Sequence, residues 1–215
     1  MYVPAHFAAE DADALIARLI GRHVALLITN GPDGTPFATH LPVLWDGERK
    51  IVTGHIARAN PQHTFGSGRA LIVLIGAEAY VSPGWYPSKV EHGKTVPTWN
   101  YESVHLTGAL EWFDDAARLE AVVRALSDRH EAGRAQPWSI EDAPRNYIDA
   151  MLRGIVGVSV AVDRIEAKRK LSQNKSDADF NGVAAGLAAS NSAEDQAIAA
   201  HMRTLRAVAD DPDGN

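Results

Sequence analysis

The 215-residue sequence contains no cysteine, and that absence removes several kinds of site at once. Without a thiol there is no disulfide, no thiolate nucleophile and no cysteine-ligated zinc or iron–sulfur centre. Long hydrophobic runs are also missing, since Val24–Ile28 and Leu71–Ile75 are far too short to span a membrane. The N-terminal stretch lacks the basic flank, apolar run and small-residue cleavage site of a secretory signal. These absences predict a cytoplasmic protein with no membrane segment.

An excess of basic residues is missing as well. Lys and Arg number 21 against 27 Asp and Glu, which gives a net charge of −6. A protein that holds DNA by itself usually presents a basic face, because neutralised phosphates supply much of the affinity. The charge balance therefore makes direct DNA binding doubtful.

The hydrophobic pattern predicts a mainly β (α+β) fold with peripheral helices. Alternating or compact apolar runs that end in turn formers predict strands at 23–29, 37–45, 50–55, 70–75, 98–113 and 155–165. Apolar residues at helical spacing predict helices at 10–20, 61–65, 115–131 and 144–152, and in an alanine-rich tail from about Ser176. Residues 83–96, rich in turn formers and charge, are expected to form a mobile surface loop. Short strands with helices around them favour a small antiparallel barrel over a parallel βαβ fold.

Pro42 lies inside the predicted strand 37–45 and marks it as unusual. Because proline has no N–H to donate to a strand ladder, this strand must be at an edge or bulged at Pro42. An edge strand also offers unpaired backbone groups that suit the rim of a planar ligand. His40, on the same strand, can equally be a surface histidine.

Arg58-Ala59-Asn60-Pro61 closely follows the strand that ends at His55. A strand end followed by a helix start leaves backbone N–H groups free, and arginine adds a forked donor that matches phosphate oxygens. This pattern favours an anion site, although an arginine ion pair with an asparagine cap is the commoner role of such residues.

Two further segments carry rings and cations. Trp99 and Tyr101 fall on one side of a strand and Asn100 on the other, so the rings suit either stacking on a planar ligand or a dimer interface. Five cations fall within twelve residues around Lys170-Leu171-Ser172-Gln173-Asn174-Lys175, although a charge run usually forms a solvated face. The His-Glu-x-x-His pattern is absent, and no metal site is predicted.

Together these segments resemble the PaiB-like family of FMN-binding split-barrel proteins, described as negative transcriptional regulators. The resemblance covers about residues 1–190 and implies a split β-barrel with antiparallel, Greek-key-like topology. It implies a flavin-binding domain over residues 1–170, and a C-terminal helical extension over residues 171–215 that packs on the barrel or on the partner subunit. It also implies a homodimer that binds one FMN per subunit where two barrels meet.

The resemblance also implies which residues bind the cofactor. His55, Arg58 and Asn60 match the family pattern around the phosphate, and the Thr39–Leu41 strand would lie along the flavin ring. Ser172, Gln173 and Lys175 would contact the flavin from the partner subunit. The full predicted set is Thr39, His40, Leu41, His55, Ala57, Arg58, Asn60, Trp99, Asn100, Lys170, Ser172, Gln173 and Lys175.

What the flavin does is left open by the sequence. One hypothesis is a negative transcriptional regulator, or a redox or ligand sensor, that acts through partners. A second is a flavin-dependent oxidoreductase of a small molecule with its own electron donor. A third is a haem-binding or haem-degrading split barrel. No paired catalytic acid and base is evident, so no catalytic residue is predicted.

Overall fold

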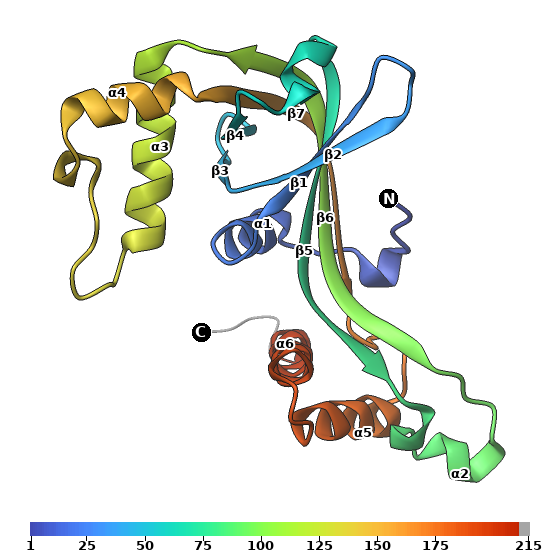
Figure 1. The fold of residues 1–215 in the computed structure, drawn as a ribbon. Coiled ribbons are helices and arrows are strands. Elements are labelled where there is room, and N and C mark those ends of the chain that lie inside the picture. Colours follow the sequence, from blue (N-terminus) through green and yellow to red (C-terminus); the bar gives the residue numbers. More distant parts are fainter. Residues whose placement is uncertain (211–215) are drawn as a thin grey trace. The chain divides into compact units, whose positions relative to one another are not determined.

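The computed structural model describes residues 1–210 of the chain (Figure 1). The last five residues of the predicted extension over 171–215 lie outside the described residues. In the described part of the chain, seven strands form one open sheet in the order β2-β1-β5-β6-β7-β4-β3. Their bounds are β1 Ala25–Asn30, β2 Pro36–Leu41, β3 Val43–Asp46, β4 Ile51–Ala57, β5 Gly68–Val81, β6 Thr98–Phe113 and β7 Ile155–Lys170. The sheet is antiparallel, which confirms the predicted fold class.

Pro42 divides one predicted strand into two. The prediction of a single strand over 37–45 is wrong, because β2 ends at Leu41 and β3 begins at Val43. β2 and β3 then form the two opposite edges of the sheet. A residue without an N–H cannot continue a ladder, so the chain changes partners there, from β1 to β4.

Within residues 1–210, six α-helices and four short 3₁₀ helices accompany the sheet. The helices are α1 Ala12–Ile20, α2 Ser88–His92, α3 Ala116–Glu131, α4 Arg145–Arg153, α5 Asp177–Ala188, α6 Ala193–Asp210, η1 Ala5–Phe7, η2 Pro61–Phe65, η3 Pro83–Trp85 and η4 Ile140–Asp142. Asp11, Asp115 and Ser176 start α1, α3 and α5 by accepting a hydrogen bond from a free backbone N–H of the first turn. The expectation of a loop over 83–96 is wrong in part, because η3 and α2 form within it.

The chain forms two compact units, and β5, β6 and β7 contribute a segment to each. The first unit comprises Met1–Glu10, Gly76–Ser103 and residues 167–210. Its core forms where α5 packs on α6 through fully buried side chains, among them Val183, Leu187, Ile198 and Met202. Burial of this apolar surface holds the two helices together.

The second unit comprises Asp11–Ile75 and Val104–Glu166. Alternation along β4 directs Val52 and Ile56 into the core, while Thr53 and His55 lie on the other face and are half-buried. Leu44 of β3, which is in register with Thr53, packs against the apolar cluster of α3 and α4. Helix α3 therefore lies against the face of β3 and β4 that carries Thr53, and α4 packs against α3 (Figure 1).

Candidate functional site

The predicted cofactor residues are divided between the two units. Seven belong to the second unit: Thr39, His40, Leu41, His55, Ala57, Arg58 and Asn60. Six belong to the first unit: Trp99, Asn100, Lys170, Ser172, Gln173 and Lys175. Within each unit the structure brings several of them together.

Asn60 joins the edge strand β2 to the start of η2. Its Nδ2 donates to Thr39 Oγ1 over 2.9 Å, and its Oδ1 accepts from the backbone N–H of Gln62 over 3.0 Å. Along β2, Thr39 is half-buried, His40 is exposed and Leu41 is buried. Asn60 is thus both the helix cap that its sequence position indicates and the contact that fixes Thr39.

Gln62 is a structural residue of this region that the predicted set omits. It is 1% exposed, and its Nε2 donates to Thr29 Oγ1 over 3.0 Å and to the carbonyls of Leu27 and Phe37 over 3.3 Å. A buried amide must find such partners. Gln62 therefore ties η2 to β1 and β2 and holds Asn60 in place.

Arg58 is clamped to the turn between α4 and β7. Its Nε donates to the carbonyl of Arg153 over 2.8 Å, its Nη2 to that of Ile155 over 2.9 Å, and its backbone N–H to that of Gly154 over 2.8 Å. Arg58 and Arg153 also line a cavity of 260 Å³ at the start of α3. The other lining residues are Asp114, Ala116, Leu119, Asp149 and Leu152.

His55 lies on β4 in register with Gly157 of β7. A side chain at position 157 would collide with the Phe113 ring, 2.2 Å from its nearest carbon, so the ring lies directly against the sheet there. Burial lowers the pKa of His55 below its ordinary value. Its Nδ1 is buried and has no hydrogen-bond partner in the part of the chain that the structure describes. Ala57 ends the strand and is exposed.

In the first unit, β6 has the predicted alternation. Trp99 is half-exposed and its ring centroid lies 5.9 Å from that of Tyr80, whereas Asn100 is fully buried. Asn100 Nδ2 and Ser172 Oγ lie 3.0 Å apart, and Ser172 is also buried. Asn100 and Ser172 therefore bind each other beneath the surface on which Trp99 lies.

The end of β7 carries the predicted cations. Lys170 Nζ donates to the carbonyl of Trp99 over 2.6 Å and to Thr98 Oγ1. Burial, together with the nearby charges of Lys168 and Lys175, lowers the pKa of Lys170. The sequence predicts a strand that ends at residue 165, with Lys170 beyond it. In the structure β7 continues to Lys170 and places that residue beside β6.

Gln173 and Lys175 follow the strand and lie close to their own chain. Gln173 Oε1 accepts from the backbone N–H of Leu171 over 2.7 Å, and its Nε2 donates to the carbonyl of Arg169 over 2.5 Å. Lys175 Nζ lies 5.1 Å from the centroid of the Tyr86 ring, a cation–π distance.

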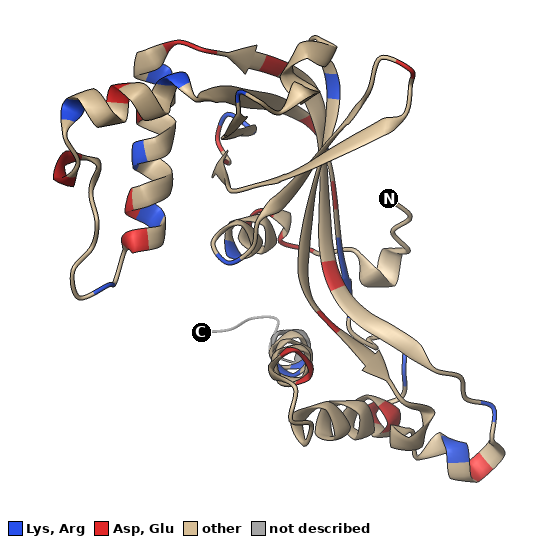
Figure 2. Cartoon of the chain, viewed as in Figure 1, with Lys and Arg blue, Asp and Glu red and all other residues tan. Residues whose placement is uncertain are grey.

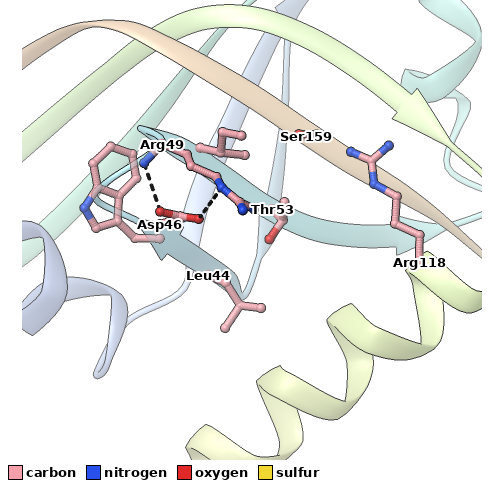
Figure 3. Close-up of a pocket in the computed structure, with 8 residues that line it drawn as sticks. Leu44, Asp46, Arg49, Thr53, Arg118 and Ser159 are labelled. Carbon is pink, nitrogen blue, oxygen red and sulfur yellow. Dashed lines mark hydrogen bonds and ion pairs between the residues drawn. The ribbon is translucent and has the colours of Figure 1, made fainter.

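The second unit also contains a pocket that sequence reasoning missed (Figure 3). It has a volume of 340 Å³ and is lined by Leu44, Trp45, Asp46, Arg49, Ile51, Thr53, Arg118 and Ser159. Thr53 and Ser159 are strand hydroxyl residues among apolar neighbours, and that pattern was the available signal in the sequence. Among the described residues, no group of three or more His, Asp or Glu side chains is placed to hold a metal ion.

Comparison with known proteins identifies the family. The sequence profile described as "Putative FMN-binding domain" matches residues 1–164. The protease synthase and sporulation protein PAI 2 of Bacillus subtilis is 31% identical over 187 residues, which cover 85% of this chain and 87% of that protein. The chain belongs to the PaiB-like family. The resemblance to this family that the sequence showed is thereby confirmed.

Solved structures agree with the PaiB-like assignment in fold. A conserved hypothetical protein of Mycobacterium tuberculosis has a TM-score of 0.58 at 16% identity, covering 82% of this chain and 94% of that one. A flavocytochrome of Azotobacter vinelandii has a TM-score of 0.55 at 17% identity, covering 78% and 72%. These likenesses show the split-barrel fold alone. No helix within residues 1–210 is long and apolar enough to cross a membrane.

Proposed function

We propose that this PaiB-like protein is a cytoplasmic homodimer that binds FMN and acts as a redox or ligand sensor with a negative effect on transcription. The observation that carries the proposal is the match of residues 1–164 to an FMN-binding family. In this proposal residues 1–170 hold the flavin, and residues 171–215 form a helical extension on the barrel or on the partner subunit.

The cavity beside Arg58 supports a phosphate site. Arg58 and Arg153 line it, and two donors of the Arg58 guanidinium already hold that side chain in place. A preorganised fork suits a phosphate dianion. Asp114 and Asp149 line the same cavity, and Arg145 pairs with Asp149 Oδ1 over 2.8 Å and offsets its charge, which leaves two arginines against the one carboxylate of Asp114. The residues present therefore fit the phosphate of FMN, which would supply the redox chemistry when bound.

The remaining predicted residues fit the ring and the dimer. β2 is an edge of the sheet, so Thr39–Leu41 can offer backbone groups to the rim of a flavin. Trp99 and Tyr80 form a ring pair in which each is about half-exposed, and such an apolar patch needs a cover. We propose that a second subunit, with its own bound flavin, covers this ring pair.

The charge distribution supports action through partner proteins. Lys and Arg are interspersed with Asp and Glu on α3 and α4 (Figure 2), and many are already paired. Arg124 and Arg145, for example, lie 2.5 Å from Glu141 and 2.8 Å from Glu120. Paired cations contribute little to phosphate binding, so we do not propose an operator-binding surface on this chain alone.

A flavin-dependent oxidoreductase acting on a small molecule is the second candidate function. His55 favours it, because its half-buried imidazole has a lowered pKa and its buried Nδ1 has no partner among the described residues. A neutral imidazole can accept a proton at neutral pH. An electron donor would then be required as a second partner.

The absorption spectrum of the purified protein, before and after FMN titration, tests these proposals. Flavin bands that remain after gel filtration are expected, and light scattering should report a dimer at micromolar concentration. A Soret band in place of flavin bands would instead indicate a haem protein. Failure of added FMN to bind would remove the proposal, and a monomer would remove the interface site.

A further inference from the structure

The pocket in Figure 3 has the composition of a small-molecule site, and none of the residues predicted to bind FMN lines it. We propose that this pocket, between α3 and the strands β3, β4 and β7, binds a small organic carboxylate. A ligand in this pocket would be the small molecule that the proposed sensor detects. Binding of this ligand can be measured whether or not FMN binds.

The floor of the pocket is set by strand register. Leu44 of β3 is paired with Thr53 of β4, and Thr53 is paired with Ser159 of β7, so the three side chains form one row on one face of the sheet. Ser159 is only 6% exposed although it is a polar residue. No hydrogen bond of either hydroxyl is found among the described residues. Two hydroxyls thus lie side by side at the bottom of a pocket and lack a partner.

The two ends of the pocket carry guanidinium groups, and Figure 3 shows Arg49 and Arg118 on opposite sides of Thr53. The Arg118 guanidinium lies 3.7 Å from the centroid of the Phe113 ring, and its Nη1 lies 2.5 Å from Glu111 Oε1. These contacts hold Arg118 in one orientation. Ion pairing alone would leave a half-exposed arginine mobile.

Arg49 is the more available of the two cations. Its side chain is 78% exposed, and its Nε is 3.9 Å from Asp46 Oδ2, a long ion pair within one turn. The Asp46 carboxylate also accepts the backbone N–H of Arg49 over 3.0 Å. Asp46 is thus occupied by Arg49, while the two Nη groups of Arg49 have no partner in the described part of the chain.

The chemistry of the lining selects the class of ligand. Apart from Asp46, the polar side chains that line the pocket with accessible donors carry guanidinium or hydroxyl groups, and the one carboxylate is already engaged. Such a site favours a ligand that accepts several hydrogen bonds, which a carboxylate does with two oxygens. The charges of Asp46 and Glu111 offset those of the two arginines, so a monoanion fits better than a dianion. Leu44 and Ile51 provide apolar walls for a small hydrocarbon body.

The size of the pocket agrees with a small ligand. Its 340 Å³ is near the lower end of the range of small-molecule sites, about 300–1,000 Å³. Benzoate, with one carboxylate and a compact apolar ring, is therefore a suitable probe. Benzamide has nearly the same shape without the charge, and it serves as the matched control ligand.

Isothermal titration calorimetry of the full chain with benzoate tests the proposal, in parallel for FMN-free and FMN-loaded protein. A ligand of this size should bind the parent protein with a Kd of about 1 mM. Benzamide should bind at least about tenfold more weakly, because it lacks the charge-assisted bonds. The benzoate affinity should be the same with and without FMN, whereas FMN binding is monitored separately by its visible absorption.

Three variants locate the binding. Arg49→Gln should weaken benzoate about tenfold, and Thr53→Val, which keeps the shape but removes the hydroxyl, about threefold. Arg134→Gln is the matched control, because Arg134 is also exposed and makes an ion pair within one turn, with Glu131 over 3.2 Å. Its benzoate affinity should equal that of the parent.

Three results would overturn the proposal. The first is the absence of benzoate binding by the parent at about 20 mM, well above the Kd expected for a ligand of this size. The second is equal affinity for benzoate and benzamide, or equal affinity of Arg49→Gln and Arg134→Gln. The third is loss of benzoate binding on loading with FMN, which would place the flavin itself in this pocket while leaving the proposed flavin function intact.

Discussion

Arg58 has two roles: it stabilises the turn between α4 and β7, and we propose that it binds the phosphate of FMN. Its guanidinium donates to the carbonyls of Arg153 and Ile155, and it also lines the cavity that we propose for the phosphate. Replacing Arg58 by Ala should weaken FMN by roughly ten- to a hundredfold, since a charge-assisted bond contributes about 1.5–3 kcal/mol. Riboflavin, which lacks the phosphate, should bind parent and variant equally, and Arg58→Lys should restore only part of the loss because a point charge does not reproduce the fork.

The structure adds a second readout for the same variant. Loss of the two hydrogen bonds to the α4–β7 turn should lower the free energy of unfolding by about 1–2 kcal/mol, measured by urea denaturation. The ratio of FMN to riboflavin affinity separates this structural effect from phosphate binding. Equal losses for both ligands would mean that Arg58 holds only the fold or the ring.

His55 should make the stability of the protein depend on pH. Burial lowers its pKa below 6.5, so the unfolded chain takes up the proton first as the pH falls. The free energy of unfolding should therefore be highest above about pH 6.5 and decrease on acidification until the pH passes the folded-state pKa. His55→Gln should reduce this decrease, as measured by urea unfolding at about pH 7.5 and about pH 5.5.

A second half-buried histidine, His105, also contributes to the pH dependence of stability. Burial also lowers the pKa of His105, so the pH dependence should become smaller in His55→Gln without disappearing. His23→Gln, at an exposed position, is the control and should behave as the parent. An unchanged pH dependence in His55→Gln would show that the imidazole is open to water.

At the scale of elements, α5 is shaped by two glycines that receive Trp85. A Cβ added to Gly182 would lie 2.2 Å from the Trp85 carbonyl oxygen, and one added to Gly186 would lie 2.5 Å from indole carbons. Alanine at either position should destabilise the protein by about 1–3 kcal/mol, although alanine is the better helix former. Gly182→Ala should have the larger effect on stability. Its new Cβ would collide with the backbone of Trp85, whereas the Cβ of Gly186→Ala would collide with the indole ring, which can shift.

Thermal or urea denaturation of the two variants checks this expectation. Gly68→Ala is the control, since a Cβ there would meet no atom within 4 Å, and its stability should stay close to that of the parent. If Gly182→Ala proved as stable as Gly68→Ala, η3 would not be held against α5 in solution.

At the scale of the whole molecule, the charge balance decides what the chain can bind by itself. With 21 basic and 27 acidic residues, few cations are available to displace counterions from DNA. Duplex DNA should therefore bind with a Kd of about a micromolar or weaker at physiological salt, measured by fluorescence anisotropy. A sequence-specific nanomolar complex of this chain alone would favour direct repression and contradict action through partners.

The amino-acid sequence by itself determined the features that depend on local pattern. The bounds of β6 (Thr98–Phe113) and η2 (Pro61–Phe65) agree with prediction, because periodicity and turn residues act over a few neighbouring positions. The family assignment belongs here too, since it rests on the sequence match of residues 1–164. The alternation of exposed Trp99 and buried Asn100 likewise follows from strand geometry alone.

Only the tertiary structure decided which distant residues meet. Arg58 and Arg153 are 95 positions apart, and nothing local indicates that one donates to the carbonyl of the other. The pairing of Thr53 with Ser159, which forms the floor of the carboxylate pocket, exists only because β4 lies beside β7. Strand order of this kind is set by the burial of the whole apolar surface, a property that no single segment contains. For the same reason the two halves of the predicted strand at Pro42 became opposite edges of one sheet.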